Sequence, residues 1–352
     1  MSNRRFSLAV LFTLFVTGQA EAALTFNFNA AAGTPQNVID GFAAAGQRWS
    51  ALFTDSVTVN VNIAFPSLGP GILGSTSSTR GTIDYTSYKA ALTADRKSAD
   101  DVTAAASLQS GSTFNMLLNY TNNNPNGVGS ATAYLDNDGD ANNSTIRLTL
   151  ANARALGLFP AVDATLDASI SFSSNFAWDF DPSNGIDTSA FDFIGVATHE
   201  IGHALGFVSG VDTLDVNSTS PTFFNDNVFT FVSPLDLYRF SASSTGVGSG
   251  VIDWTAGLNG VDRYFSIDGG ATKIASFSTG QVHGDGRQAS HWKDNLGIGI
   301  LDPTAARGEF LALTVNDFRA MDVIGWDPVP EPASVVLLAS AVLLAALRRR
   351  SS

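Results

Sequence analysis

Residues 198–212 read THEIGHALGFVSGVD, and this stretch decides which fold the rest of the chain must support. It contains the pattern HExxH, formed by His199, Glu200 and His203. If the segment is helical, residues four apart lie one turn apart on one face, so both imidazole rings can reach one metal ion. Glu200 lies about 100° around the helix, where its carboxylate can reach a water molecule beside that ion. The motif therefore predicts a zinc site with Glu200 as general base.

The sequence around the motif predicts a helix over residues 191–207. Thr188 and Ser189 can cap its start, and Asp192 follows Ser189 by three residues, which is the spacing of a capping box. Its apolar side is made by Phe191, Ile194, Ala197, Ile201, Ala204 and Leu205. Gly202 is unusual in this helix, because an internal glycine costs about 1 kcal/mol relative to alanine. Close approach of a strand or a substrate would explain it.

A third metal ligand must come from outside the motif, since zinc sites in hydrolases use three protein ligands. The extended motif HExxHxxGxxH would place this ligand at residue 209, which is Ser209, a poor zinc ligand. Of the four histidines in the chain, the two outside the motif are His283 and His291. His283 lies in the stretch TGQVHGDGRQ, whose glycines are typical of an exposed loop. The alternatives that the residues leave open are Asp212, Asp215, His283, His291 and Glu309.

His291 precedes Trp292 in the stretch ASHWKDNLGIGILDPT, which ends near a Leu-Asp-Pro turn. Together with Gly206 at the end of the predicted helix, this arrangement resembles the metzincin peptidases, and the leishmanolysin-like members in particular, where a long insertion precedes the third histidine. The resemblance implies that His291 completes the zinc site and that the turn lies under the metal. It covers residues 191–206 and 290–326. Leu301 stands where those proteins have methionine, a change that nearly conserves volume.

The spacing of apolar residues predicts an α+β fold. Helices are expected from Thr34-Pro35, over 85–108 and after Thr314, and strands over 57–65, 114–118, 145–150 and 168–172. Residues 67–82 are rich in Gly, Ser and Thr, which predicts a loop. The resemblance implies a zincin- or metzincin-like, two-lobed metallopeptidase domain over residues 23–328. It would have a mixed sheet, an active-site helix and a C-terminal helix. Its upper lobe would span about 23–208 and its lower lobe about 209–328. An extended substrate would lie beside the strand 168–172.

The composition excludes several classes of function. The chain has 352 residues, of which 44% are hydrophobic and 14% charged, and its formal net charge is -13. Such an acidic protein is a poor partner for nucleic acids and for anionic membranes. It has no cysteine, which excludes disulfides, a cysteine nucleophile and a thiolate zinc site. The disulfides common in leishmanolysin-like proteins are therefore absent.

Both ends of the chain carry sorting features. Residues 1–22 combine two arginines, an apolar run and the sequence AEA, which predicts a signal peptide. Residues 329–352 combine the triplet Pro330-Glu331-Pro332, an apolar segment and three arginines, and they resemble the PEP-CTERM sorting signal of Gram-negative bacteria. The resemblance implies a short transmembrane helix that anchors the protein transiently in the inner membrane. It also implies a membrane sorting protease that acts at the triplet, and delivery to the cell surface, the extracellular matrix or the medium.

Two further features allow more than one interpretation. The stretch YLDNDGDANNS carries Asp136, Asp138 and Asp140 at the spacing that begins a calcium loop, but it lacks the glycine and glutamate of an EF-hand. A polar hairpin loop is the simpler interpretation, and a loose Ca²⁺ site is the alternative. Tyr238 could stabilise an oxyanion or pack in the core, and packing is the default. The role of Asp236 is equally open.

The leading hypothesis is an exported zinc-dependent endopeptidase. Zn²⁺ would be held by His199, His203 and His291, and Glu200 would deprotonate the metal-activated water. Its partners would be a protein or peptide substrate and the sorting protease, with no nucleic acid. One alternative is a non-catalytic surface or matrix adhesion protein that uses a protease-like fold with structural zinc. Another is a zinc hydrolase that acts on a non-peptide bond, such as a matrix ester.

Overall fold

The computed structural model describes residues 23–257 and 260–330, which form a mixed α+β protein with several small sheets. The predicted signal peptide at residues 1–22 lies outside the described residues, as does the apolar C-terminal segment from residue 331, predicted to be a short transmembrane helix. Within the described ranges, no helix has the length and apolarity needed to cross a membrane.

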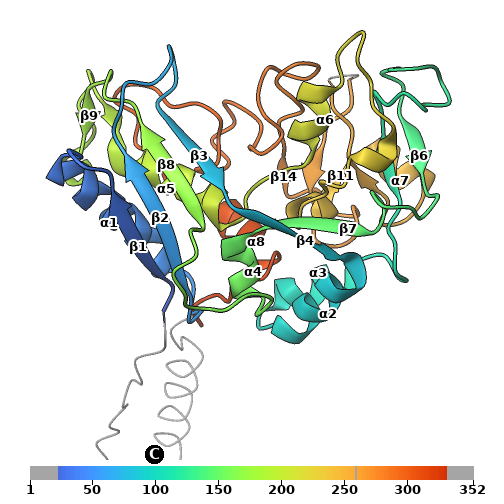
Figure 1. The fold of residues 1–352 in the computed structure, drawn as a ribbon, viewed down its shortest axis with the longest axis horizontal. Coiled ribbons are helices and arrows are strands. Elements are labelled where there is room, and N and C mark those ends of the chain that lie inside the picture. The colour runs from blue at the N-terminus through green and yellow to red at the C-terminus, as the bar shows by residue number, and fades with distance from the viewer. Residues whose placement is uncertain (1–22, 258–259, 331–352) are drawn as a thin grey trace, which may run out of the picture.

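The largest sheet has four strands in the order β1-β2-β8-β3 and lies at one end of the molecule (Figure 1). The strands are β1 (Thr25–Ala30), β2 (Thr58–Ala64), β8 (Ala168–Phe172) and β3 (Gly74–Ser78). β1, β2 and β8 run parallel, whereas β3 pairs antiparallel with β8 at the edge of the sheet. Val59, Val61 and Ile63 of β2 are buried at alternate positions, which confirms the predicted strand.

Two helices pack against each other behind this sheet, α1 (Gln36–Ser50) and α5 (Phe193–Leu205) (Figure 1). α1 turns Val38, Phe42, Ala45 and Trp49 into the core, as its sequence pattern predicts. The indole Nε1 of Trp49 donates to the backbone oxygen of Thr198 at 2.9 Å. This bond connects α1 to the helix that carries the HExxH motif.

The strands β4 (Arg80–Asp84) and β7 (Thr145–Thr149) form an antiparallel pair in the middle of the molecule (Figure 1). They lead into the helices α2 (Tyr85–Asp95), α3 (Ala99–Ser107) and α4 (Leu150–Ala155). The predicted helical region 85–108 is confirmed in the main, but it is divided into the two helices α2 and α3. Ser98 and Asp101 form a capping box that starts α3, so the chain satisfies the exposed N–H groups of a second helix instead of continuing the first.

Short strands and helices make up the other end of the molecule. The sheet β12-β5-β6 contains Ile252–Asp253, Met116–Leu118 and Tyr134–Asp136, and the sheet β11-β13-β14 contains Arg239–Phe240, Tyr264–Phe265 and Ala275–Ser276. The helices here are α6 (Val211–Asn217) and α7 (Ala242–Val247), with short 3-10 turns at Asp226–Val228 and Leu235–Tyr238. A further 3-10 turn, Pro182–Asn184, comes before α5 in the chain. The predicted lobe boundary near residue 209 stays a prediction, and β12 pairs across it with β5.

The C-terminal helix α8 (Val315–Asp322) begins at Thr314, as predicted, with Asp317 completing a capping box. Trp326 follows it and donates from Nε1 to the backbone oxygen of Leu205 at 3.0 Å. Phe318 stacks on Phe53 just beyond α1. The end of the described chain is therefore packed against the ends of α1 and α5.

The prediction that residues 67–82 form a loop is wrong. Residues 74–78 are β3, and β4 begins at Arg80. In β3, intermediate and exposed side chains alternate, and Ser and Thr occupy every position after Gly74. A strand at the edge of a sheet with one face in solvent does not need an apolar face, so its sequence lacks the hydrophobic alternation that identifies buried strands.

Candidate metal centre

The helix α5, which carries the HExxH motif, begins at Phe193, two residues later than predicted. Phe191 and Asp192 form the short strand β10, which pairs with β9 (Trp178–Asp179). Asp192 caps the helix, since its Oδ1 accepts from Gly195 N at 2.8 Å. Ser189 and Thr188 do not cap it, which corrects the prediction. The helix ends at Gly206, whose φ of 128° favours glycine.

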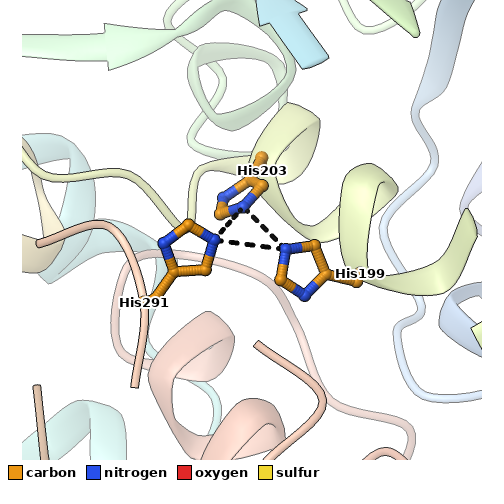
Figure 2. Close-up of side chains that lie close together, drawn as sticks. All are labelled: His199, His203 and His291. Carbon is orange, nitrogen blue, oxygen red and sulfur yellow. Dashed lines mark hydrogen bonds between the residues drawn. The ribbon is translucent and has the colours of Figure 1, made fainter. Parts of the chain in front are cut away.

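The imidazole rings of His199, His203 and His291 point toward one another (Figure 2). Their Nε2 atoms are 3.1 Å apart between His199 and His203, 3.2 Å between His203 and His291, and 3.3 Å between His199 and His291. Tetrahedral zinc with Zn–N bonds of about 2.0–2.1 Å spaces its nitrogen ligands by roughly 3.3–3.4 Å. The three nitrogens therefore fit one zinc ion. His291 approaches the other two although it follows His203 by 88 residues.

The opposite ring nitrogen of each histidine faces a backbone carbonyl. Nδ1 lies 2.8 Å from the oxygen of Ile300 in His199, 2.7 Å from that of Phe207 in His203, and 3.3 Å from that of Gln288 in His291. A carbonyl can only accept, so Nδ1 carries the proton and each Nε2 presents a lone pair to the centre. This is the tautomer that metal binding needs.

Burial favours the neutral form of the His203 and His291 rings. Burial chiefly, together with the neighbouring His199, lowers the pKa of His203 to about 3. Burial likewise lowers the pKa of His291 well below its ordinary value, with His203 and His199 adding to the effect. Neutral imidazole is the form that binds a metal ion.

Glu200 lies beside the three histidines and is only 7% exposed. The hydroxyl of Thr76, on β3, lies 2.7 Å from its Oε2 and 2.9 Å from its backbone oxygen. A Cβ on Gly74 would lie 3.0 Å from Oε1, so the carboxylate fits closely beneath the edge strand. Burial raises the pKa of Glu200, while His199 and the Thr76 hydroxyl lower it.

Asp212 holds the segment that presents His291 and is not part of the histidine cluster. Its carboxylate accepts from Ala289 N at 2.6 Å and from Ser290 N at 3.2 Å, and it also accepts from the Ser290 hydroxyl. The Ser290 hydroxyl in turn accepts from Ser209 N at 2.8 Å. Both carboxylate oxygens of Asp212 are occupied by this segment. The residue immediately before His291 is thus tied to the chain that follows α5.

The other candidate ligands lie elsewhere. His283 stacks on Tyr120 with 4.0 Å between ring centroids, and its Nε2 lies 2.7 Å from the backbone oxygen of Ser218. Asp215 accepts from the backbone nitrogens of Val282 and His283. Its role for the His283 loop parallels that of Asp212 for the His291 segment.

The turn after His291 lies beside the histidine cluster, where the Ile300 oxygen is 2.8 Å from His199 Nδ1, and Asp317 organises it. Asp317 accepts from Ile300 N, Leu301 N and the indole of Trp292 at 2.9, 3.3 and 2.8 Å. Leu301 is fully buried, and a Cβ on Gly202 would lie 3.1 Å from its Cδ1. The same Cβ would lie 3.2 Å from the Trp49 ring. The lack of space between Leu301 and Trp49 explains why residue 202 is a glycine. The close neighbours of Gly202 are thus side chains of the turn and of α1 rather than a strand, and the approach of a substrate stays a prediction.

Tyr238 and Asp236 are structural. Tyr238 is fully buried and contacts the edge of the Phe265 ring, which confirms the packing interpretation. Asp236 accepts from the hydroxyl of Ser209 and the indole nitrogen of Trp254, and from two backbone nitrogens. Neither residue lines the cleft that contains the histidines.

That cleft has a volume of about 760 Å³ and includes all three histidines, Glu200 and residues 71–76 of the β3 region. β8 is paired on both edges, with β2 and with β3. A substrate cannot pair with β8, which corrects the expectation for residues 168–172. β3 has β8 as its sheet neighbour in the described part of the chain, and it borders the cleft.

Thr76 is the site residue that sequence reasoning missed. It lies in the stretch interpreted as a loop, and serines and threonines occur on both sides of it. Its position next to Glu200 depends on the pairing of β3 with β8, which joins residues about a hundred positions apart. The run of Thr and Ser residues is a weak strand signal and could have raised the question.

Comparison with known protein families matches residues 328–350 to the PEP-CTERM protein-sorting motif. The motif implies that this is an exported bacterial protein that a sorting machinery recognises, with surface- or membrane-associated sorting. No curated protein and no solved structure matches the chain. The match lies at the C-terminus, so the resemblance to metzincin peptidases stays a prediction.

Proposed function

We propose that the chain is an exported zinc-dependent endopeptidase with a metzincin-like arrangement of its site. The observation that carries the proposal is the convergence of three Nε2 atoms within 3.3 Å of one another, directly beside the buried carboxylate of Glu200. His199, His203 and His291 would hold the ion. A structural zinc site needs no carboxylate next to its ligands, whereas hydrolysis needs a base there.

Zinc, when bound, would activate a water molecule and polarise the scissile carbonyl. The residues of the chain supply the rest. The backbone carbonyls of Ile300, Phe207 and Gln288 fix the imidazole orientations. Glu200 accepts the proton from the attacking water and delivers it to the leaving amine. Thr76 holds Oε2 of the carboxylate, which leaves Oε1 to exchange the proton.

The edge strand β3 favours an extended peptide as the substrate. The β3 region borders the cleft, and an extended peptide can hydrogen-bond to the open edge of such a strand. Apolar residues also line the cleft, among them Ile72, Val196 and Leu311. An adhesion protein with structural zinc would not require a general base in this cleft. A hydrolase for a non-peptide bond would not require a strand edge beside it.

The test compares Glu200→Gln with wild type on an unstructured protein such as fluorescently labelled casein. Glu309→Gln is the matched control, because Glu309 is an exposed glutamate in the segment 306–309. We expect Glu200→Gln to keep its zinc and lose at least about 10²-fold in kcat, and Glu309→Gln to behave as wild type. Retained hydrolysis in Glu200→Gln would exclude this role. If folded, zinc-loaded wild type cleaves nothing, the adhesion hypothesis is favoured.

The sorting signal completes the proposal. We infer that a membrane sorting protease acts at Pro330-Glu331-Pro332, that the C-terminal segment anchors the protein only transiently in the inner membrane, and that the peptidase then reaches the cell surface, the matrix or the medium. The matched motif at residues 328–350 supports this route.

A further inference from the structure

Three carboxylates meet far from the histidines, at the end of β6. Asp136 ends β6, Asp138 lies in the following turn, and Asp226 begins a 3-10 turn some ninety residues later. One oxygen of each lies within 4.8 Å of the others. Asp136 and Asp226 are each only 3% exposed, whereas Asp138 is open to solvent. Two buried carboxylates this close repel each other unless one of them is protonated or a cation lies between them.

The partners of these carboxylates in the described residues are neutral. Asp226 Oδ2 accepts from Asn123 Nδ2 at 2.6 Å and from the Tyr134 hydroxyl at 3.0 Å, and its Oδ1 accepts from Asn227 N at 2.8 Å. Asp138 Oδ1 accepts from Asp140 N at 3.2 Å. The ion pairs of the described chain all involve other aspartates. The cluster is thus left with uncompensated negative charge.

The pKa of Asp136 reflects both its burial and this uncompensated negative charge. Its pKa is raised to about 7, chiefly by burial and further by the charges of Asp226, Asp138 and Asp140. Each charged neighbour that shifts this pKa is another carboxylate. A bound cation would remove the repulsion and keep Asp136 ionised.

A buried amide reaches into the same cluster. Asn142 is fully buried, and its Nδ2 lies 2.8 Å from Asp136 Oδ2. Its Oδ1 is buried as well and has no hydrogen-bond partner among the described residues. A buried amide oxygen without a donor costs about 1–3 kcal/mol. In the structure Nδ2 is the atom that faces Asp136. If a cation bound there, the amide could turn by half a turn, so that Oδ1 would face the cation and gain the partner that it lacks.

We propose that Asp136, Asp138, Asp226 and Asn142 form a binding site for a divalent cation, and that the cation is calcium. The donors are all oxygens, which suit calcium and disfavour zinc. They come from the end of a strand, the turn after it and a distant 3-10 turn, and calcium accepts variable geometry where magnesium requires an octahedron. Asp226 supplies from a distant segment the acidic ligand that an EF-hand takes from its own loop. The cation would fasten residues 226–228 to the β6 turn.

The test measures calcium binding to the zinc-loaded protein by calorimetry, together with the melting temperature with and without calcium. Asp138→Asn and Asp226→Asn are compared with Asp40→Asn, a control at an exposed carboxylate on α1. Wild type and the control should bind one calcium ion per chain and melt at a higher temperature with calcium. Both site variants should bind at least tenfold more weakly, and magnesium should give a smaller shift.

Asp138 is exposed, so Asp138→Asn keeps the test valid if Asp226→Asn does not fold. The proposal is overturned if folded wild type shows no saturable binding up to about 10 mM calcium, above the roughly 10⁻⁴–10⁻³ M range of weak extracellular sites. It is also overturned if Asp138→Asn binds calcium as wild type does. Neither result depends on whether the histidine site is catalytic, since no peptidase activity is measured.

Discussion

At the scale of single residues, the spacing in the sequence predicts where the HExxH side chains lie relative to one another. It does not predict the position of Thr76. The pattern HExxH fixes the relation between His199, Glu200 and His203 once the segment is helical. His291 could be proposed because the chain has few histidines and because its context resembles a known family. Thr76 could not, because its contact with Glu200 is created by the pairing of two strands.

Replacing Thr76 with valine should lower kcat of the proposed reaction about 10- to 100-fold, with KM and zinc content little changed. Valine keeps the shape of threonine but removes the hydroxyl that lies 2.7 Å from Glu200 Oε2. Thr76→Ser retains the hydroxyl and should recover most of the activity. Steady-state kinetics of the two variants provide the measurement. A valine variant with the kcat of wild type would show that this hydrogen bond does not position the base.

At the scale of elements, the sequence predicts those with a buried apolar face and misjudges those without one. α1, β2 and β8 were predictable because their apolar residues recur at helix or strand spacing. α8 was predictable from its cap at Thr314, although Val315, expected to face inward, is exposed. β3 was missed because polar residues suit an edge strand. The break between α2 and α3 was missed because a capping box interrupts a stretch that is otherwise favourable for helix.

The segment that presents His291 should depend on Asp212 in the helix α6. Asp212→Ala removes an acceptor for Ala289 N, Ser290 N and the Ser290 hydroxyl, so His291 loses its support. We expect zinc affinity to fall about 10- to 100-fold, measured by competition with a chelating dye. Asp215→Ala is the control, because Asp215 supports the His283 loop in a similar way. Equal zinc affinities in the two variants would contradict this account.

At the scale of the whole molecule, long-range pairing brings the parts together, and the sequence does not reveal it. β12 joins β5, and residues after α8 pair with residues after α1, through the bridge between Phe53 and Pro328. Asp55 and Asp327 are both buried at the junction between Phe53 and Pro328. Burial chiefly, and the charge of Asp327 in addition, raise the pKa of Asp55 to about 7. Carboxyls buried at such a junction make the stability of the protein depend on pH.

The stability of the protein should fall as the pH rises from about 4 to 7. The pKa of Asp55 is about 7 in the folded protein and 3.8 when unperturbed. The folded state therefore binds the proton more tightly, and this contribution is lost as the pH rises through the folded pKa. Asp55→Asn stays neutral and still accepts from Asp327 N, so its stability should fall less over this range. Urea unfolding at several pH values measures the difference, and an identical slope in both proteins would argue against it.

The most direct test of the proposed zinc site is the zinc content of the purified protein and of its His291→Ala variant, with His283→Ala as the control. The account predicts one zinc ion per chain in wild type and in His283→Ala, and a marked loss in His291→Ala, because His291 supplies the third nitrogen within 3.3 Å of the other two. Equal zinc in His291→Ala and wild type, or no zinc in a folded wild-type protein supplied with the metal, would contradict it.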